Sequence, residues 1–162
     1  GIFEMKRNFP IFVSQPYIYI ANNYDNVNCL IRELPQHSFG LKMLFPVIAL
    51  SGLKFLRPEL TAFPLYVTKT ELTTVTLIYD AWYDFGILGV VAFCALLGFV
   101  AARLEKKRRE QHSPVFCMFY AQFSIYIMLS FFTTWFSNPA TWVYFLETGL
   151  IAWFIGGKRQ WG

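Results

Sequence analysis

The sequence predicts an all-α polytopic membrane protein with about three transmembrane helices and a polar region outside the lipid. Of its 162 residues, 56% are hydrophobic and 20% are aromatic, whereas soluble domains contain about 45–50% apolar residues. Only 15% of the residues are charged, against about 25% in soluble domains. Long uncharged segments alternate with short basic clusters in the second half of the chain, which is the pattern of membrane spans and their flanking loops.

Residues 1–84 are predicted to form an external loop region. Pro10 and Pro16 are expected to break any long helix near the N-terminus, and the asparagines that follow them favour turns. An apolar run of about sixteen residues follows near 41–56. This is shorter than the roughly 20 residues that cross a bilayer, and Pro46 interrupts it. We therefore expect an interfacial or re-entrant helix near 41–56.

The remaining residues, 85–162, are predicted to hold the transmembrane helices. The first segment has eighteen residues without a charge, which span about 27 Å as a helix. A basic loop, Arg103–Ser113, is expected to follow this segment. The predicted spans lie near 85–102, 114–136 and 142–155.

The basic residues indicate which way the chain crosses the membrane. They cluster in the loop 103–113 and at Lys158 and Arg159, and loops rich in Lys and Arg stay in the cytoplasm. With three spans, the C-terminus is cytoplasmic and residues 1–84 face the outside. The net charge of +4 is explained by these flanking clusters, so we expect no nucleic-acid partner. The chain opens on glycine, and we expect it to be a piece of a longer protein.

Two carboxylates precede the first predicted span and are the candidate catalytic residues. Asp80 and Asp84 are four residues apart, so they share a helical face if the helix extends back from the span. Two like charges at this spacing raise one pKa toward the range of a general base. The alternative for Asp84 is a structural one, in which it caps the N-terminus of the span.

Other polar and aromatic residues of the external region are candidate substrate contacts. Arg57 and Arg32 suit phosphate oxygens, because a guanidinium binds them bidentately. Aromatic ring faces stack on sugars and amides bond sugar hydroxyls, and the candidates are Tyr79, Trp82, Tyr83 and Asn22. An aromatic belt at the membrane surface is the alternative explanation. No Cys or His spacing typical of a metal site occurs, so no metal or other cofactor is predicted.

The stretch TELTTVTLIYDAWYDFGILGVVAFCALLGF resembles the C-terminal part of bacterial oligosaccharide repeat unit polymerases, the O-antigen (Wzy-type) polymerase family. The shared pattern is a threonine-containing loop, an aromatic turn, and a Tyr–Asp–Phe–Gly step into a membrane helix. In this chain the pattern falls on Thr73, Thr74, Tyr79, Tyr83, Asp84, Phe85, Gly86 and Gly89.

The resemblance implies a metal-independent membrane glycosyltransferase of the bacterial inner membrane. Such enzymes polymerise undecaprenyl-pyrophosphate-linked repeat units at its outer face, for O-antigen, capsule or exopolysaccharide synthesis. Asp84 first and Asp80 second would accept the proton of the attacking hydroxyl, and Arg57 and Arg32 would stabilise the leaving pyrophosphate. The implied partners are the lipid-linked oligosaccharide, membrane lipids and a chain-length regulator protein.

Three other functions stay open at this point. An O-antigen ligase shares the substrate and the topology. A polysaccharide transporter or flippase subunit carries out no chemistry, and it would keep polar residues along its spans, whereas the spans here are apolar apart from Glu147. The third alternative is a structural membrane segment without a site.

Overall fold

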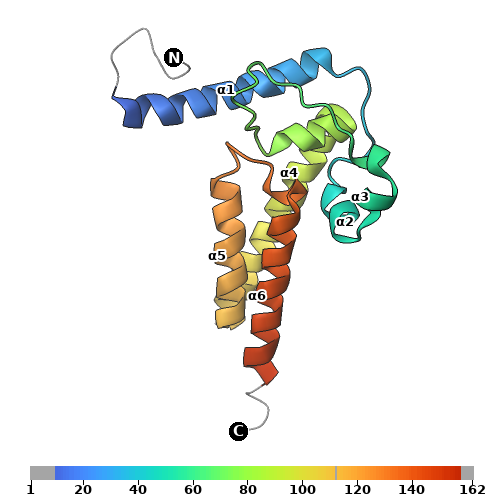
Figure 1. The fold of residues 1–162 in the computed structure, drawn as a ribbon. Helices are drawn as coiled ribbons and strands as arrows, with labels where there is room; N and C mark the ends of the chain where they lie inside the picture. The colour runs from blue at the N-terminus through green and yellow to red at the C-terminus, as the bar shows by residue number, and fades with distance from the viewer. Residues whose placement is uncertain (1–9, 112, 158–162) are drawn as a thin grey trace.

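The structure is a computed structural model that describes residues 10–111 and 113–157. Within these residues it contains helices and turns but no strand, which confirms the predicted all-α class. Figure 1 shows a bundle of helices side by side, with another helix lying across one end of it. In chain order the elements are α1 (Ile11–Glu33), α2 (Phe45–Leu50), α3 (Leu53–Leu56), η1 (Pro58–Thr61), α4 (Ile78–Gln111), α5 (Pro114–Met128), η2 (Trp135–Ser137) and α6 (Pro139–Gly157).

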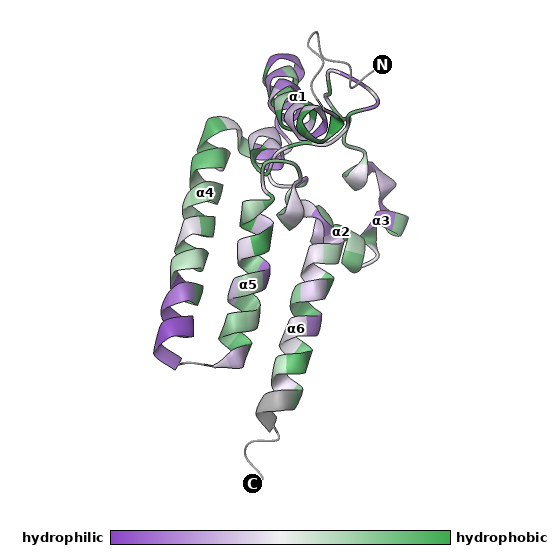
Figure 2. Cartoon of the chain, turned by 90° about the vertical axis from the view of Figure 1, so that its left-hand side faces the viewer, coloured by the Kyte–Doolittle hydropathy of each residue, from purple (hydrophilic) through white to green (hydrophobic). Residues whose placement is uncertain are grey.

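The bundle of α4, α5 and α6 has the character of a membrane segment. Among the described residues, α4 is the one helix long and apolar enough to cross a bilayer, and α5 is apolar but only 15 residues long. Large apolar side chains face outward, such as Leu88 at 78% and Leu146 at 65% exposure. Figure 2 shows apolar residues along all three helices and hydrophilic residues at the far end of α4. A membrane protein is thus supported, and the number of crossings stays a prediction.

Helix α4 breaks at Gly86, one residue after the predicted start of the first span. Gly86 has φ 62° and ψ −147°, a conformation outside the helical region that a residue with a Cβ adopts only at a cost. The break brings the first turns of α4 close to Gly89, where an added Cβ would lie 2.5 Å from the carbonyl oxygen of Ala81. The two glycines therefore allow the turns that carry both candidate carboxylates to fold back against the apolar part of the helix.

Replacing Gly89 by alanine is expected to destabilise the fold by about 2 kcal/mol, because backbone must move to admit the methyl group. Gly98→Ala is the matched control, since a Cβ at Gly98 meets no atom within 4 Å and alanine is the better helix former. The measurement is the thermal unfolding midpoint of both variants in detergent. Equal midpoints would show that the close approach at Gly89 does not exist.

The N-terminal region differs from its prediction, because α1 is a helix where a break and turns were expected. It begins directly after Pro10 and continues through Pro16. Its asparagines Asn22, Asn23 and Asn26 are buried and bond to distant segments: the amide of Asn26 donates to the carbonyl oxygens of Leu72 and Thr74, both at 2.9 Å. These tertiary bonds outweigh the turn preference of asparagine.

Helix α4 also runs further than predicted, through most of the expected loop Arg103–Ser113. Glu105 accepts hydrogen bonds from Arg108, three residues later, at 2.7 Å and from Arg109, four residues later, at 2.5 Å. Pairs at these spacings stabilise a helix, so the charged segment stays helical to Gln111.

The boundaries of the other helices also differ from the predicted ones. The expected helix near 41–56 is divided into α2 and α3 at Gly52, whose φ is 77°. α5 ends at Met128 instead of residue 136, and a turn that contains η2 follows. α6 begins earlier than predicted, at Pro139. Thr148 of α6 donates a hydrogen bond to the side-chain oxygen of Gln122 in α5 at 2.9 Å, which ties these two helices together.

Candidate functional site

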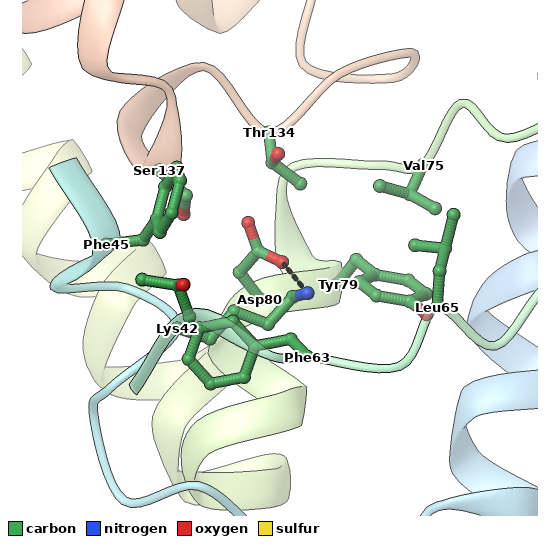
Figure 3. Close-up of a pocket in the computed structure, with 10 residues that line it drawn as sticks. Lys42, Phe45, Phe63, Leu65, Val75, Tyr79, Asp80, Thr134 and Ser137 are labelled. Atoms are coloured by element: carbon green, nitrogen blue, oxygen red, sulfur yellow. Dashed lines mark ion pairs between the residues drawn. The ribbon is translucent and has the colours of Figure 1, made fainter. Parts of the chain in front are cut away.

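A pocket of about 290 Å³ lies where the first turns of α4 meet the segments before α2 and α6. Figure 3 shows its lining side chains converging from several parts of the chain. They combine one carboxylate and one ammonium group with aliphatic hydroxyls and aromatic rings. The lining residues are Lys42, Phe45, Thr61, Phe63, Leu65, Val75, Tyr79, Asp80, Thr134 and Ser137.

An ion pair between Asp80 and Lys42 forms the polar centre of this pocket. The Lys42 Nζ lies 3.7 Å from a carboxylate oxygen of Asp80, and the two side chains are only 14% and 6% exposed (Figure 3). Three rings surround the ammonium, with centroids 4.6 Å away for Tyr83, 5.2 Å for Phe63 and 5.7 Å for Tyr79. The ammonium is thus held by one carboxylate and by the negative faces of the rings.

The environment of Asp80 changes its affinity for a proton. Asp80 lies before the break at Gly86, outside the predicted span 85–102. Burial raises the pKa of the Asp80 carboxyl, while the Lys42 ammonium and the hydroxyls of Ser137 and Thr134 oppose the rise. A buried carboxylate with a raised pKa accepts a proton more readily than an exposed one, which is what a general base requires.

Asp84 lies behind the pocket and does not line it. It is fully buried, and its carboxylate accepts hydrogen bonds from the backbone N–H of Lys42 at 3.1 Å, from that of Met43 at 2.7 Å and from the hydroxyl of Ser38. These bonds cap the turn that leads into α2, whereas the sequence suggested a cap on α4 itself. Asp84 therefore fixes the backbone that carries Lys42.

The three predicted sugar-stacking rings are placed differently from one another. Tyr79 lines the pocket, and its hydroxyl accepts from the backbone N–H of Tyr66 at 2.9 Å and donates to the carbonyl oxygen of Tyr66 at 3.0 Å. Tyr83 is 4% exposed and packs against Phe63 and Tyr66. Trp82 is half-buried against the same cluster. Of the three, only Tyr79 contributes to the wall of the pocket.

The remaining predicted contacts lie away from the pocket. Arg57 is exposed and 3.7 Å from Glu59, which is exposed as well. Arg32 is exposed in the last turn of α1. Asn22 is buried, and its amide donates to the carbonyl oxygen of Leu72 at 3.0 Å. The structure thus brings Asp80 and Tyr79 together at the pocket, and it holds Asn22 in a structural contact.

Lys42 is the principal pocket residue that the sequence did not single out. Its one signal was a lysine within an apolar run, a residue type that is almost never buried without a partner. Thr134 and Ser137 gave no signal, because they come from a turn that was expected to lie partly in a span. Within residues 10–111 and 113–157, no group of three or more His, Cys, Asp or Glu side chains is arranged to hold a metal ion.

Comparison of the chain with protein-family models, curated proteins and solved structures finds no match. The likeness of residues 70–99 to the polymerase family is therefore an expectation from the sequence. The structure gives physical reasons for three positions of that pattern. Asp84 holds the Lys42 turn, Gly86 has a positive φ, and Gly89 leaves room for the carbonyl of Ala81.

Proposed function

We propose that this chain carries the site of a membrane glycosyltransferase that polymerises oligosaccharide units linked to a polyprenyl pyrophosphate at the outer face of the bacterial inner membrane. The observation that carries the proposal is the buried Asp80–Lys42 pair in an aromatic-walled pocket at one end of an apolar helix bundle. Rings and hydroxyls suit a sugar, and the ammonium suits a phosphate.

The reaction assigns one role to each member of the pair. A hydroxyl oxygen of the acceptor sugar attacks the anomeric carbon of the donor, and its proton passes to the Asp80 carboxylate. The bond between the anomeric carbon and the pyrophosphate oxygen breaks, and its electron pair leaves with the pyrophosphate. Lys42 stabilises the charge on this leaving group, because an ammonium in a buried site acts more strongly than in water.

The arrangement of the bundle supports the proposed orientation. The pocket is at the end where α4 begins, and the hydrophilic end of α4 lies at the opposite end of the bundle, beside the start of α5 (Figure 2). With the charged end in the cytoplasm, the pocket opens on the outer side, where the lipid-linked units are presented. Lys158 and Arg159 belong to this argument from the sequence, and they lie outside the described residues. Arg57 and Arg32, both exposed, remain proposed contacts for an approaching pyrophosphate.

Lys42→Met in the full-length protein is expected to lower polymer formation about 100-fold, the usual effect of losing one electrostatic contact to a developing charge. Lys54→Met is the matched control, because Lys54 is an exposed lysine of α3, and it should leave the polymer unchanged. The measurement is the chain-length ladder of the cell-surface polysaccharide on a gel, together with the amount of protein in the membrane.

A further variant separates catalysis from folding. Lys42→Met leaves Asp80 buried without a counter-charge, so the double variant Lys42→Met/Asp80→Asn removes both charges together. The double variant should be present at the normal level and inactive.

The product that accumulates separates the candidate functions. Accumulation of single-unit lipopolysaccharide identifies a polymerase. Free polymer that is not joined to lipid A indicates a ligase, and units retained inside the cell indicate a transporter. A normal ladder from Lys42→Met contradicts the proposal.

A further inference from the structure

We propose that a second, apolar cavity, which opens on the surface of the bundle, holds the single hydrocarbon chain of the lipid carrier, with its phosphate group at Lys42. This inference rests on the proposed function, because the carrier belongs to the substrate named there. The cavity has a volume of about 570 Å³ and lies between α4, α5 and α6. Its walls are apolar apart from one hydroxyl, that of Ser137, and six of the lining residues are aromatic.

The apolar cavity extends along the axis of α4. Its α4 wall includes Phe93, Leu97 and Leu104, and the eleven steps from the first to the last cover about 16 Å along the helix axis. The opposite wall is formed by residues of α5 and α6, including Phe123 and Phe145. A space that runs along a helix axis between apolar walls suits an extended hydrocarbon chain, and the competition test below distinguishes one chain from the two of a phospholipid.

The apolar cavity and the polar pocket are neighbours. Ser137 lines both of them. The segment before α2 also contributes to both, since Lys42 faces the polar pocket while Met43 and Leu44 line the apolar cavity. Among the residues that the structure describes, Lys42 is the one basic residue that lines either space. An amphiphile could therefore place its anionic head beside the Lys42 ammonium and its apolar tail against the walls of the apolar cavity.

The test is photo-crosslinking of the full-length protein in lipid nanodiscs. The probe is a polyprenyl phosphate that carries a diazirine in its chain and no sugar, so labelling requires no catalysis. We expect adducts on wall residues such as Leu97 and Phe123, mapped by mass spectrometry. Leu97→Trp fills the cavity and should lower labelling at least tenfold. Val100→Phe adds less side-chain volume to the cavity and should also lower labelling.

Leu88→Trp is the matched control, because Leu88 is 78% exposed on the outside of α4 and lines neither cavity, so labelling should be unchanged. Adducts confined to the outer surface, or labelling that both filling variants leave intact, would overturn the inference. Competition by a diacyl phosphatidic acid as strong as that by unlabelled polyprenyl phosphate would also overturn it, because the cavity would then take a bulk lipid. Labelling of the wild-type protein requires no catalysis, so a failure of the catalytic proposal leaves the labelling intact and is distinguishable from a failure of this inference.

Discussion

Asp80→Asn is expected to reduce polymer formation by about 100-fold or more, since a positioned general base contributes about 10²–10⁴ to a rate. Asparagine has nearly the same size as aspartate and can still bond to Lys42 and the neighbouring hydroxyls, but it cannot accept the proton of the attacking sugar. The fold should therefore survive while the reaction fails. The measurement is the rate at which purified full-length protein extends a lipid-linked oligosaccharide.

The control for this change is Asp25→Asn, which removes an exposed carboxylate from α1 and should leave the rate unchanged. The pH profile gives a second readout. Burial raises the pKa of Asp80, and a base acts only when it is ionised, so the wild-type rate should fall with decreasing pH at a higher pH than an ordinary aspartate would give. A wild-type rate in Asp80→Asn would exclude this residue as the base.

Asp84→Ala is expected to give the largest loss of stability, about 3 kcal/mol, because it removes the acceptor for three hydrogen bonds and leaves buried donors without partners. Asp84→Asn keeps one acceptor oxygen and should cost less than the alanine variant. The measurements are the thermal unfolding midpoint in detergent and the rate of protease cleavage within the turn 38–43, which these bonds hold.

These variants also decide which carboxylate is catalytic. The sequence resemblance ranked Asp84 ahead of Asp80, whereas the geometry favours Asp80, because only Asp80 lines the pocket. If Asp84 positions Lys42, polymer formation in Asp84→Asn should fall in proportion to the loss of stability. Full stability of Asp84→Ala combined with complete loss of polymer would instead place Asp84 in contact with the substrate.

The parts of the fold that the sequence could predict are those set by composition and local pattern. The uncharged run identified the apolar part of α4 and placed its start within one residue of the break at Gly86. The apolar run near 41–56 is helical from Phe45 onward, although a glycine divides it. Helix ends were less predictable: α4 continues through a charged segment, because neighbouring side chains of that segment pair along the helix.

The site was harder to predict because contacts distant in the chain decide it. Lys42 and Asp80 are 38 positions apart, and the place of Lys42 in an apolar run does not indicate which carboxylate it will contact. The burial of Asn26 has the same origin, since its partners lie in the segment 68–74. Tertiary partners therefore replaced the expected turn around the asparagines, and they brought to Asp80 a lysine that the sequence had not assigned to the site.

The break at Gly86 divides α4 into two segments with different surroundings. Below it lies the apolar segment, and in a bilayer such a segment leans to match the thickness of its lipid. Above it, the residues that carry Asp80 are fastened to the 38–43 turn through the side chain and the backbone of Asp84. The spacing between the Asp80 carboxylate and the Lys42 ammonium is thus set by hydrogen bonds above the break and by no contact of the apolar segment below it.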